Sequence, residues 1–556
     1  MSRSIAARGA MTLPLAALLI VAGCTAPADR PATDVPRSTR YEDLTALFTQ
    51  WRAFQKPKVV DGLPDYTAGA MAAQAKELIS YQRRLAAIDP NGWPIPQQVD
   101  YQLVRAEMSG LDFDHRVLKP WANNPAFYVT VFSDRSDQPA REGPQALGAV
   151  ELWSYRFPLD AGSAARVDSG IRTIPGLFMQ ARRNLVGTGK DLWVYGAKSV
   201  REQAAELAKL GTAAATAPGN LKADVERAKA ATDSFAVWLD SLAPTKIGPS
   251  GVGVANYDWY LKNVQLVPYT WAEEVAIMQR ELDRAWASLA LEEHRNGRLP
   301  AQVPLASAAE HARRFNAAVT EYMAFIKGHD LMTVRAEMEP ALRAQIGTFA
   351  AGPREFFTEV DYRDPEVMRT HGYHWFDLAR MANDPHASPI RRGALLYNIF
   401  NTRTEGHATG WEELMLQAGM FDARPRSREL IYILLAERAA RALGDLRMHS
   451  NEFTLEQASA FAAGNTPRGW LSLGANLVRA EQHLYLQQPG YGTSYVIGKL
   501  EVEKLLARRK RQLGDTFTMR RFMDEFNAAG LVPASLLRWE LTGLQPDDVK
   551  RMLAPR

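Results

Sequence analysis

The chain has 556 residues, of which 46% are hydrophobic and 23% charged, and these proportions argue against disordered, collagen-like and multi-span membrane proteins. Its 66 basic and 62 acidic residues give a net charge of +4, too small and too evenly mixed to indicate a nucleic-acid partner. The single cysteine, Cys24, excludes an intrachain disulfide, a thiolate zinc cluster and a dithiol redox pair.

Residues 1–23 are predicted to be the signal peptide of a bacterial lipoprotein. The apolar run at residues 11–22 is too short for a membrane span, which needs about 20 residues. The sequence Val21-Ala22-Gly23-Cys24 is similar to the lipoprotein box, whose cysteine receives fatty acyl chains such as palmitate. We expect a lipidated Cys24 and a flexible tether over residues 24–40, which anchor the protein to a membrane of the cell envelope. Thr25 in place of Asp favours the outer membrane, with the protein facing the periplasm.

The remaining chain, residues 41–545, is predicted to be one mainly α domain, a large multi-helix body with minor β elements. Apolar residues from Leu44 to Phe54 recur at three- and four-residue steps, as the buried face of a helix requires. Similar patterns predict helices at residues 66–88, 97–109, 199–216, 221–242, 271–295, 305–327, 391–420, 427–448, 471–487, 494–513 and 518–529.

Other local signals complete this prediction. Thr454 and Gln457 have the spacing of a capping box, which predicts a helix start. The runs Phe127–Phe132 and Phe356–Val360 are typical of strands. The Gly- and Pro-rich stretch at residues 243–254 is a candidate subdomain boundary.

The motifs of several enzyme classes are absent from the sequence, but histidines are concentrated in one region. There is no phosphate-binding loop, no Gly-x-Ser-x-Gly elbow and no His-Glu-x-x-His helix. His371, His374, His386 and His407 lie close together in the sequence. On one helix, the three-residue spacing of His371 and His374 lets both imidazoles face one point. Two histidines and a Glu from a second helix can bind Zn²⁺ and leave a position for water, whereas the alternative is a polar helix junction without a metal.

Several segments resemble a bacterial family catalogued as domain of unknown function 885 (DUF885), whose members are often secreted or lipid-anchored. The segments that carry the resemblance are Gly253–Tyr260, Glu405–Leu414, Asp445–His449, Phe453–Ala458 and Pro489–Gly498. The resemblance covers most of residues 41–545 and is best from 395 to 540.

This resemblance implies an architecture related to mainly helical, thermolysin-like zinc peptidases. Typical members carry His-Glu-x-x-Pro-Gly-His upstream of a Glu-Gly-Trp motif. Here the corresponding stretch is Met368–Trp375, in which His374 matches the downstream histidine but the leading His-Glu pair is missing. Glu405 matches the acidic ligand position. The candidate metal ligands are therefore His374 and Glu405, with His371 as the third ligand and His407 as its competitor.

Three further residues have candidate catalytic roles. Glu412 lies on the same predicted helix face as Glu405 and is the candidate general base. Tyr495 resembles a family tyrosine that could donate a hydrogen bond to a developing oxyanion, unless it only packs in the core. Asp445 and His449 are four residues apart, so they either pair structurally or support the site from behind.

Two classes of function follow. The first is a membrane-anchored metal-dependent hydrolase of peptide or other amide or ester bonds, with a rearranged zinc site and a peptide or small-molecule substrate. The second is a catalytically inactive relative that acts as an envelope binding or scaffold protein. A count of bound metal would separate the two.

Overall fold

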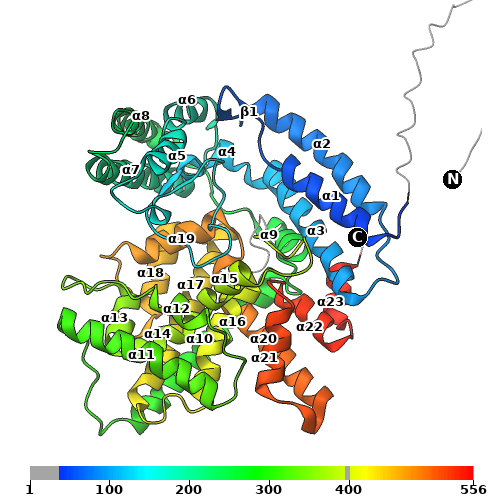
Figure 1. The fold of residues 1–556 in the computed structure, drawn as a ribbon, viewed down its shortest axis with the longest axis vertical. Coiled ribbons are helices and arrows are strands. Elements are labelled where there is room, and N and C mark those ends of the chain that lie inside the picture. The colour runs from blue at the N-terminus through cyan, green and yellow to red at the C-terminus, as the bar shows by residue number, and fades with distance from the viewer. Residues whose placement is uncertain (1–36, 395–400, 555–556) are drawn as a thin grey trace, which may run out of the picture.

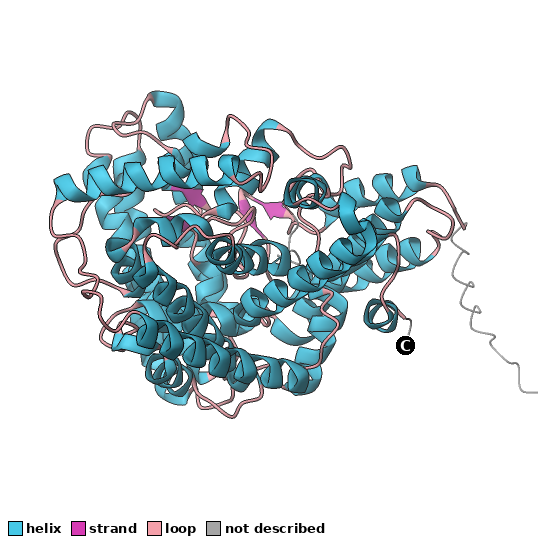
Figure 2. Cartoon of the chain, turned by 90° about the horizontal axis from the view of Figure 1, so that it is seen from below, coloured by secondary structure: helices cyan, strands magenta, loops and turns pink. Residues whose placement is uncertain are grey.

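The computed structural model describes residues 37–394 and 401–554, and this part of the chain is mainly α, as predicted (Figure 2). The predicted signal peptide, Cys24 and most of the tether lie outside the described residues. Among the helices that are described, none combines the length and the apolar character that a membrane crossing requires.

The helices of the N-terminal half form two groups in the upper part of the molecule (Figure 1). These helices are α1 (Tyr41–Phe54), α2 (Ala68–Ala86), α3 (Ile95–Phe113), α4 (Pro120–Asn123), α5 (Ala161–Ile171), α6 (Ile174–Asn184), α7 (Lys190–Ala213) and α8 (Leu221–Leu242). The α5–α8 group has a core of its own, which includes Phe178, Trp193 and Phe235. The last buried residue of this core is Leu239, shortly before residues 243–254. The subdomain boundary expected at residues 243–254 stays a prediction.

The C-terminal half forms the lower body in Figure 1. Its helices are α9 (Val254–Tyr260), α10 (Trp271–Arg295), α11 (Ala308–Gly328), α12 (Met338–Arg343), α13 (Phe356–Arg363), α14 (Pro365–His371), α15 (Tyr373–Asn383), α16 (Asn401–Gln417), α17 (Pro425–His449), α18 (Leu455–Asn465), α19 (Leu477–Gln487), α20 (Tyr491–Leu513), α21 (Met519–Ala528), α22 (Ala534–Thr542) and α23 (Asp547–Leu553). Helix α16 packs along α20, and α10 packs along α17. Helices α16 and α17 are buried on nearly every side, so they form the centre of the body.

The strands are short, and one pair shapes the site. Strands β1 (Val59–Val60) and β2 (Leu63–Pro64) form an antiparallel hairpin. Strands β3 (Val131–Phe132) and β4 (Val150–Glu151) pair in parallel, with Val131 opposite Val150. This pairing holds both ends of the intervening segment 133–149, hereafter the 133–149 loop.

Several predicted helices agree closely with the structure. Helices α8 and α10 have the predicted bounds, and the capping box of Thr454 and Gln457 opens α18 with both of its reciprocal hydrogen bonds. The amphipathic pattern was strong there because each helix buries one face and exposes the other.

Other local predictions are wrong. The run Phe356–Val360 lies in α13, where the four-residue spacing of Phe356 and Val360 places both side chains in the core. Of the predicted strand Phe127–Phe132, only Val131 and Phe132 are strand, because Pro125–Tyr128 form a 3-10 turn. Residues 391–394 are not helical, and the predicted helix is described from Asn401, after residues that lie outside the described part.

Candidate functional site

Three consecutive helices bring His371, His374 and Glu405 together. One ligand atom from each residue lies within 4.8 Å of the others. His371 is the last residue of α14 and His374 the second of α15, so the expectation of one shared helix is wrong. Gly372 separates the two helices, and a Cβ there would approach the side chain of Leu342 to 2.9 Å. The imidazoles therefore converge through a helix break and not through helical spacing.

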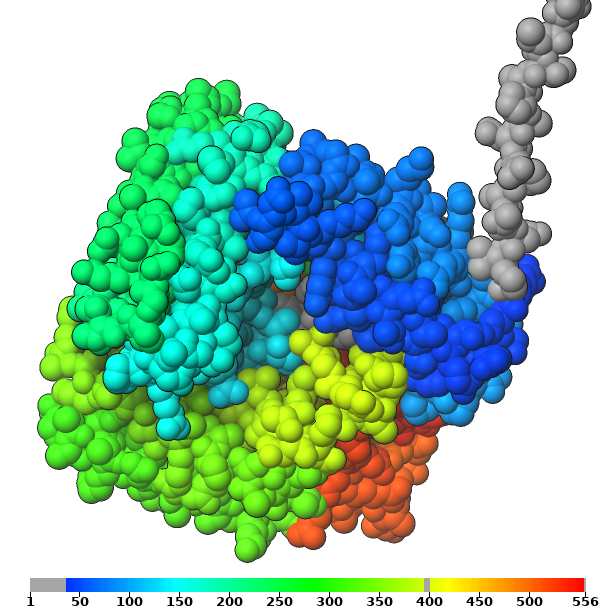
Figure 3. Space-filling view, turned by 45° about the horizontal axis from the view of Figure 1, so that its top comes forward, coloured from blue at the N-terminus to red at the C-terminus, as the bar shows by residue number. Residues whose placement is uncertain are grey.

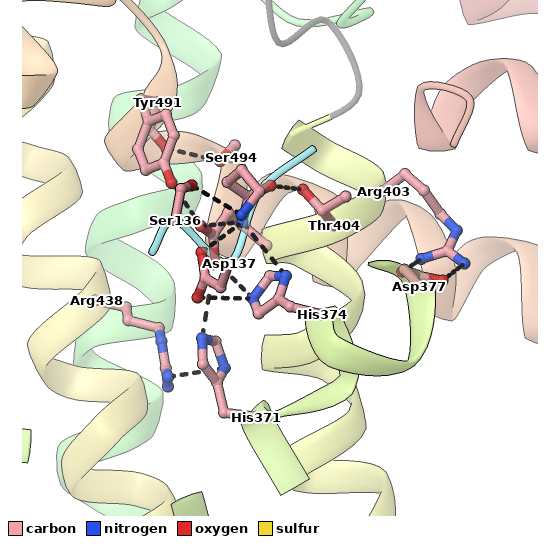
Figure 4. A network of polar contacts seen from close by, with 12 residues as sticks. Ser136, Asp137, His371, His374, Asp377, Arg403, Thr404, Arg438, Tyr491 and Ser494 are labelled. Carbon is pink, nitrogen blue, oxygen red and sulfur yellow. Dashed lines mark hydrogen bonds and ion pairs between the residues drawn. The ribbon is translucent and has the colours of Figure 1, made fainter. Parts of the chain in front are cut away.

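A buried ion pair fixes α15 against α16. Arg403 of α16 donates two hydrogen bonds to Asp377 of α15, at 2.9 and 3.1 Å (Figure 4). Both side chains are buried. Asp377 lies one turn after His374, and Arg403 lies two residues before Glu405, so the pair sets the distance between the two candidate ligands.

Glu405 is held as a carboxylate by its neighbours. Its Oε1 accepts hydrogen bonds from the Tyr491 hydroxyl at 2.6 Å and from the Gln138 amide at 2.9 Å. The Thr404 hydroxyl in turn donates a hydrogen bond to the side-chain amide oxygen of Gln138 at 2.7 Å. Burial alone would raise the pKa of Glu405, but the nearby positive charge of His374 lowers it to about 2.

His374 faces the second oxygen of this carboxylate. Its Nε2 lies 3.3 Å from Glu405 Oε2 and 4.0 Å from Asp137 Oδ2. Burial alone would lower the pKa of His374, but the negative charges of Asp137 and Glu405 raise it to about 9. Among the described residues, neither His374 Nε2 nor Glu405 Oε2 has a hydrogen bond of good geometry. A cation bound between His374 Nε2 and Glu405 Oε2 would satisfy both of these buried atoms.

His371 is oriented from behind by a second carboxylate. Its Nδ1 lies 2.9 Å from Glu412 Oε1, and its Nε2 lies 3.8 Å from Glu405 Oε2. The Arg438 guanidinium, which can only donate, lies 3.2 Å from the same Nδ1, so Glu412 and Arg438 compete for this nitrogen. A proton on Nδ1 would leave the Nε2 lone pair free for a cation beside Glu405. Arg438 donates to both oxygens of Glu412 at 2.7 Å. A carboxylate in this place can orient a metal-bound histidine, and the role of Glu412 as general base stays a prediction.

His371 and Glu405 line a cavity of about 410 Å³, and His374 is buried next to them without lining it. Its lining residues are Asp137, Glu142, Phe357, Met368, His371, Glu405, Arg438, Arg441, Glu481, Leu484, Tyr485, Tyr491 and Tyr495. Tyr495 is thus on the cavity wall, with its ring 6.5 Å from that of His371. Glu142, on the 133–149 loop, accepts a hydrogen bond from Ser136 at 3.0 Å. Burial and the neighbouring charge of Asp137 raise the pKa of Glu142 to about 7.

Two of the predicted residues lie away from this cavity. His407 is enclosed by the rings of Tyr373, Trp411 and Phe526, and burial lowers its pKa well below the usual value. It is therefore not placed to compete as a ligand. His449 is fully buried at the end of α17, with its Nε2 3.0 Å from the carbonyl oxygen of Tyr485 in α19.

Asp445, the predicted partner of His449, supports the site indirectly. The two side chains lie 3.5 Å apart, and Asp445 also accepts a hydrogen bond from the Gly492 amide at 2.9 Å. This amide belongs to the first turn of α20, which also carries Tyr491. Asp445 therefore holds the helix start that presents the Tyr491 hydroxyl to Glu405.

Four residues of the site were not predicted from the sequence. Tyr491 lies inside the Pro489–Gly498 segment that carries the family resemblance, so a signal for it was present. Asp137, Gln138 and Glu142 lie on the 133–149 loop, which has no periodicity and no motif. The pairing of β3 with β4 holds both ends of this loop, and hydrogen bonds from Gln138 to Glu405 and from Gly143 to Gln488 hold it at the site.

Comparison with known proteins supports the predicted resemblance. Residues 374–541 match the family model described as a bacterial protein of unknown function, DUF885. Two solved structures have a similar fold, and each comparison covers 90% of this chain and 98% of the other. One is a candidate lipoprotein of unknown function from Shewanella oneidensis, with a TM-score of 0.65 and 15% identity. The other is a candidate lipoprotein from Colwellia psychrerythraea, with a TM-score of 0.60 and 16% identity. The comparison with curated proteins gives no match.

Proposed function

We propose that this chain, whose residues 374–541 belong to the DUF885 family, is a lipid-anchored, metal-dependent hydrolase of peptide or other amide or ester bonds. The observation that carries the proposal is the convergence of His371, His374 and Glu405 beside a cavity. Two histidines and one carboxylate are a frequent ligand set of catalytic zinc, because they leave a fourth position for water or substrate.

Each residue around the cavity has a role in this proposal. A bound Zn²⁺ would polarise the substrate carbonyl and lower the pKa of a coordinated water. Glu142 lines the same cavity as His371 and Glu405 and would accept the proton of the attacking water, since its pKa of about 7 suits proton transfer near neutral pH. Glu412 and Arg438 orient the His371 ring through its Nδ1, and Tyr491 holds Glu405. Tyr495 donates a hydrogen bond to the developing oxyanion.

The envelope location is part of the same proposal. The lipoprotein box at Cys24 supports it, as do the descriptions of the two structural neighbours as candidate lipoproteins. We propose anchoring to the outer membrane with the folded body in the periplasm, because Thr25 and not Asp follows the cysteine.

The alternative is a catalytically inactive relative that binds a partner in the envelope. Two observations favour it: the His-Glu pair expected upstream of His374 is missing, and the Gln138 amide is hydrogen-bonded to Glu405 within the site. On this alternative, Gln138 and Tyr491 satisfy the carboxylate in place of a metal.

A metal titration combined with a hydrolysis assay tests the proposal. The full-length protein in detergent is stripped with a chelator, titrated with Zn²⁺ by calorimetry, and assayed on a panel of peptides, amides and esters. One zinc per chain and hydrolysis that chelator abolishes are the expected results. Stoichiometric zinc without hydrolysis of any panel member would favour the binding protein, and absence of zinc binding would refute the metal site.

A further inference from the structure

Asp137 of the 133–149 loop faces the candidate metal ligands. Its Oδ2 lies 4.0 Å from His374 Nε2, and Figure 4 shows Asp137 beside the rings of His371 and His374. The side chain of Asp137 is 36% exposed, whereas those of His374 and Glu405 are buried. Asp137 lines the same cavity of about 410 Å³ as His371 and Glu405. It therefore approaches the three converging residues from their solvent-facing side.

The spacing of these atoms suits ligands of one ion. Ligand atoms about 2.0–2.2 Å from a tetrahedral zinc ion lie about 3.3–3.6 Å from one another. His374 Nε2 is 3.3 Å from Glu405 Oε2, which is within this range. His371 Nε2 is 3.8 Å from Glu405 Oε2, slightly outside it. The 4.0 Å between Asp137 Oδ2 and His374 Nε2 is only a little longer. Asp137 is not among the three residues whose ligand atoms all lie within 4.8 Å of one another, so it is the outermost of the four.

The side chain of Gln138 orients both carboxylates towards His374. Its Nε2 lies 2.9 Å from Glu405 Oε1 and 3.2 Å from Asp137 Oδ1, and a third neighbour, His374 Nδ1, is 3.3 Å away. An amide nitrogen has two N–H groups, and charged acceptors form the stronger hydrogen bonds. The two N–H groups therefore serve one oxygen of each carboxylate. The other oxygens, Asp137 Oδ2 and Glu405 Oε2, both face His374 Nε2.

The residues on either side of Asp137 fix its position. The Arg135 guanidinium lies 5.1 Å from the ring of Trp153 and 5.1 Å from the ring of Trp375, which follows His374 in α15. Gln138 is buried and hydrogen-bonded to α16 through Glu405. Figure 3 shows the surface hollowed between the blue N-terminal segment and the cyan segment, whose colour is close to that of the loop. The loop thus holds Asp137 at the site while one side of it faces solvent.

We propose that Asp137 is a fourth ligand of the metal ion, in addition to His371, His374 and Glu405. The inference rests on the proposed metal-dependent hydrolase, because it adds a ligand to the same site. Two carboxylates and two neutral imidazoles balance the double positive charge of zinc, whereas the three inner ligands leave one positive charge uncompensated in a buried place. As the outermost and most exposed ligand, Asp137 is the one that yields its position to water or substrate.

Zinc titration of two loop variants tests the inference. In calorimetry on the full-length protein in detergent, Asp137→Asn should lower zinc affinity about tenfold, because a neutral amide replaces the carboxylate. Asp134→Asn is the matched control, since Asp134 is an exposed acid of the same loop that does not line the cavity. It should change the affinity by about twofold or less. An affinity of Asp137→Asn equal to that of the parent would overturn the inference, whereas a parent protein that binds no zinc would refute the proposed metal site as well.

Cobalt(II) bound to a cysteine variant separates coordination from a general effect of charge. A thiolate ligand gives cobalt(II) a charge-transfer band in the near ultraviolet, which carboxylate and imidazole ligands do not give. Asp137→Cys saturated with cobalt should show this band, and Asp134→Cys should not. The parent, whose single cysteine is Cys24, supplies the background. Absence of the band in Asp137→Cys, or an equal band in Asp134→Cys, would show that residue 137 does not bind the ion.

Discussion

Gly406 in α16 and Gly498 in α20 face each other at a very close helix contact. A Cβ built on Gly406 would lie 2.2 Å from the Cα of Gly498, and one built on Gly498 would lie 2.1 Å from the backbone oxygen of Thr402. The absence of both side chains lets the two helices touch through their backbones. Because Glu405 precedes Gly406, this contact sets how close the carboxylate comes to Tyr491 on α20.

The first prediction concerns this contact. Gly498→Ala should destabilise the protein by about 1–3 kcal/mol and weaken zinc binding, because the new methyl group forces α16 away from α20. Gly464→Ala in α18 is the control: a Cβ there meets nothing within 4 Å, so stability should be unchanged or slightly raised. Denaturant unfolding measures the free energy of unfolding of both variants. Equal effects of the two substitutions would contradict the packing argument.

The second prediction concerns the ligand set. Glu405→Gln, His371→Gln and His374→Gln should each lower zinc affinity at least about 100-fold, because each removes one ligand. His407→Phe is the control, since this ring is enclosed by aromatic side chains and has no hydrogen-bond partner among the described residues. It should bind zinc like the parent protein in calorimetry. A loss of zinc binding in His407→Phe would show that the ligands are assigned wrongly.

The third prediction is the pH dependence of zinc binding. The pKa of His374 is raised to about 9, so its ring carries a proton at neutral pH that zinc must displace. The apparent affinity should therefore rise about tenfold per pH unit from pH 6.5 towards pH 9, with release of a proton detectable in buffers of different ionisation enthalpy. A pH-independent affinity over this interval would contradict the protonated His374.

The same pKa shift predicts how the metal-free protein responds to pH. A raised folded-state pKa stabilises the fold fully below the unfolded pKa, near 6.5, and this contribution is lost as pH rises through about 9. The difference in the free energy of unfolding between the parent and His374→Gln should thus shrink from pH 6.5 to pH 9.5. Urea unfolding in the presence of chelator measures it.

The fourth prediction assigns the proton acceptor. Glu142→Gln should lower the hydrolysis rate about 10²- to 10⁴-fold and leave zinc affinity unchanged, because Glu142 is not one of the three ligands. Glu142→Asp should retain part of the rate. If Glu142→Gln is fully active while Glu412→Gln is inactive with normal zinc affinity, Glu412 is the base.

The fifth prediction concerns the anchor. Cys24→Ala should release the protein from the membrane fraction or leave an unprocessed precursor, because the acyl chains have no other attachment site. Fractionation with and without detergent, together with mass spectrometry of the N-terminus, measures this. A Cys24→Ala protein that stays with membranes like the parent would disprove the lipid anchor.

The fold class, most of the long helices and part of the candidate site could be predicted from the sequence. Helices such as α8 and α10 could be predicted because each buries one face, so their apolar periodicity is written in the chain. Glu405 and His374 could be identified because they match motif positions. Helices such as α14 and α15 were missed, since they are short and the break at Gly372 has no strong local signal.

Only the tertiary structure decided what surrounds these residues. The 133–149 loop places Gln138 and Glu142 at the site through the pairing of β3 with β4, and sequence separation hides that contact. The surroundings of Glu412 likewise depend on a distant residue, because Arg438 donates a hydrogen bond to each of its oxygens. The apolar periodicity of a helix depends on residues close together in the sequence, so it can be predicted. The pKa values of side chains and the shapes of cavities depend on residues that distant segments bring together.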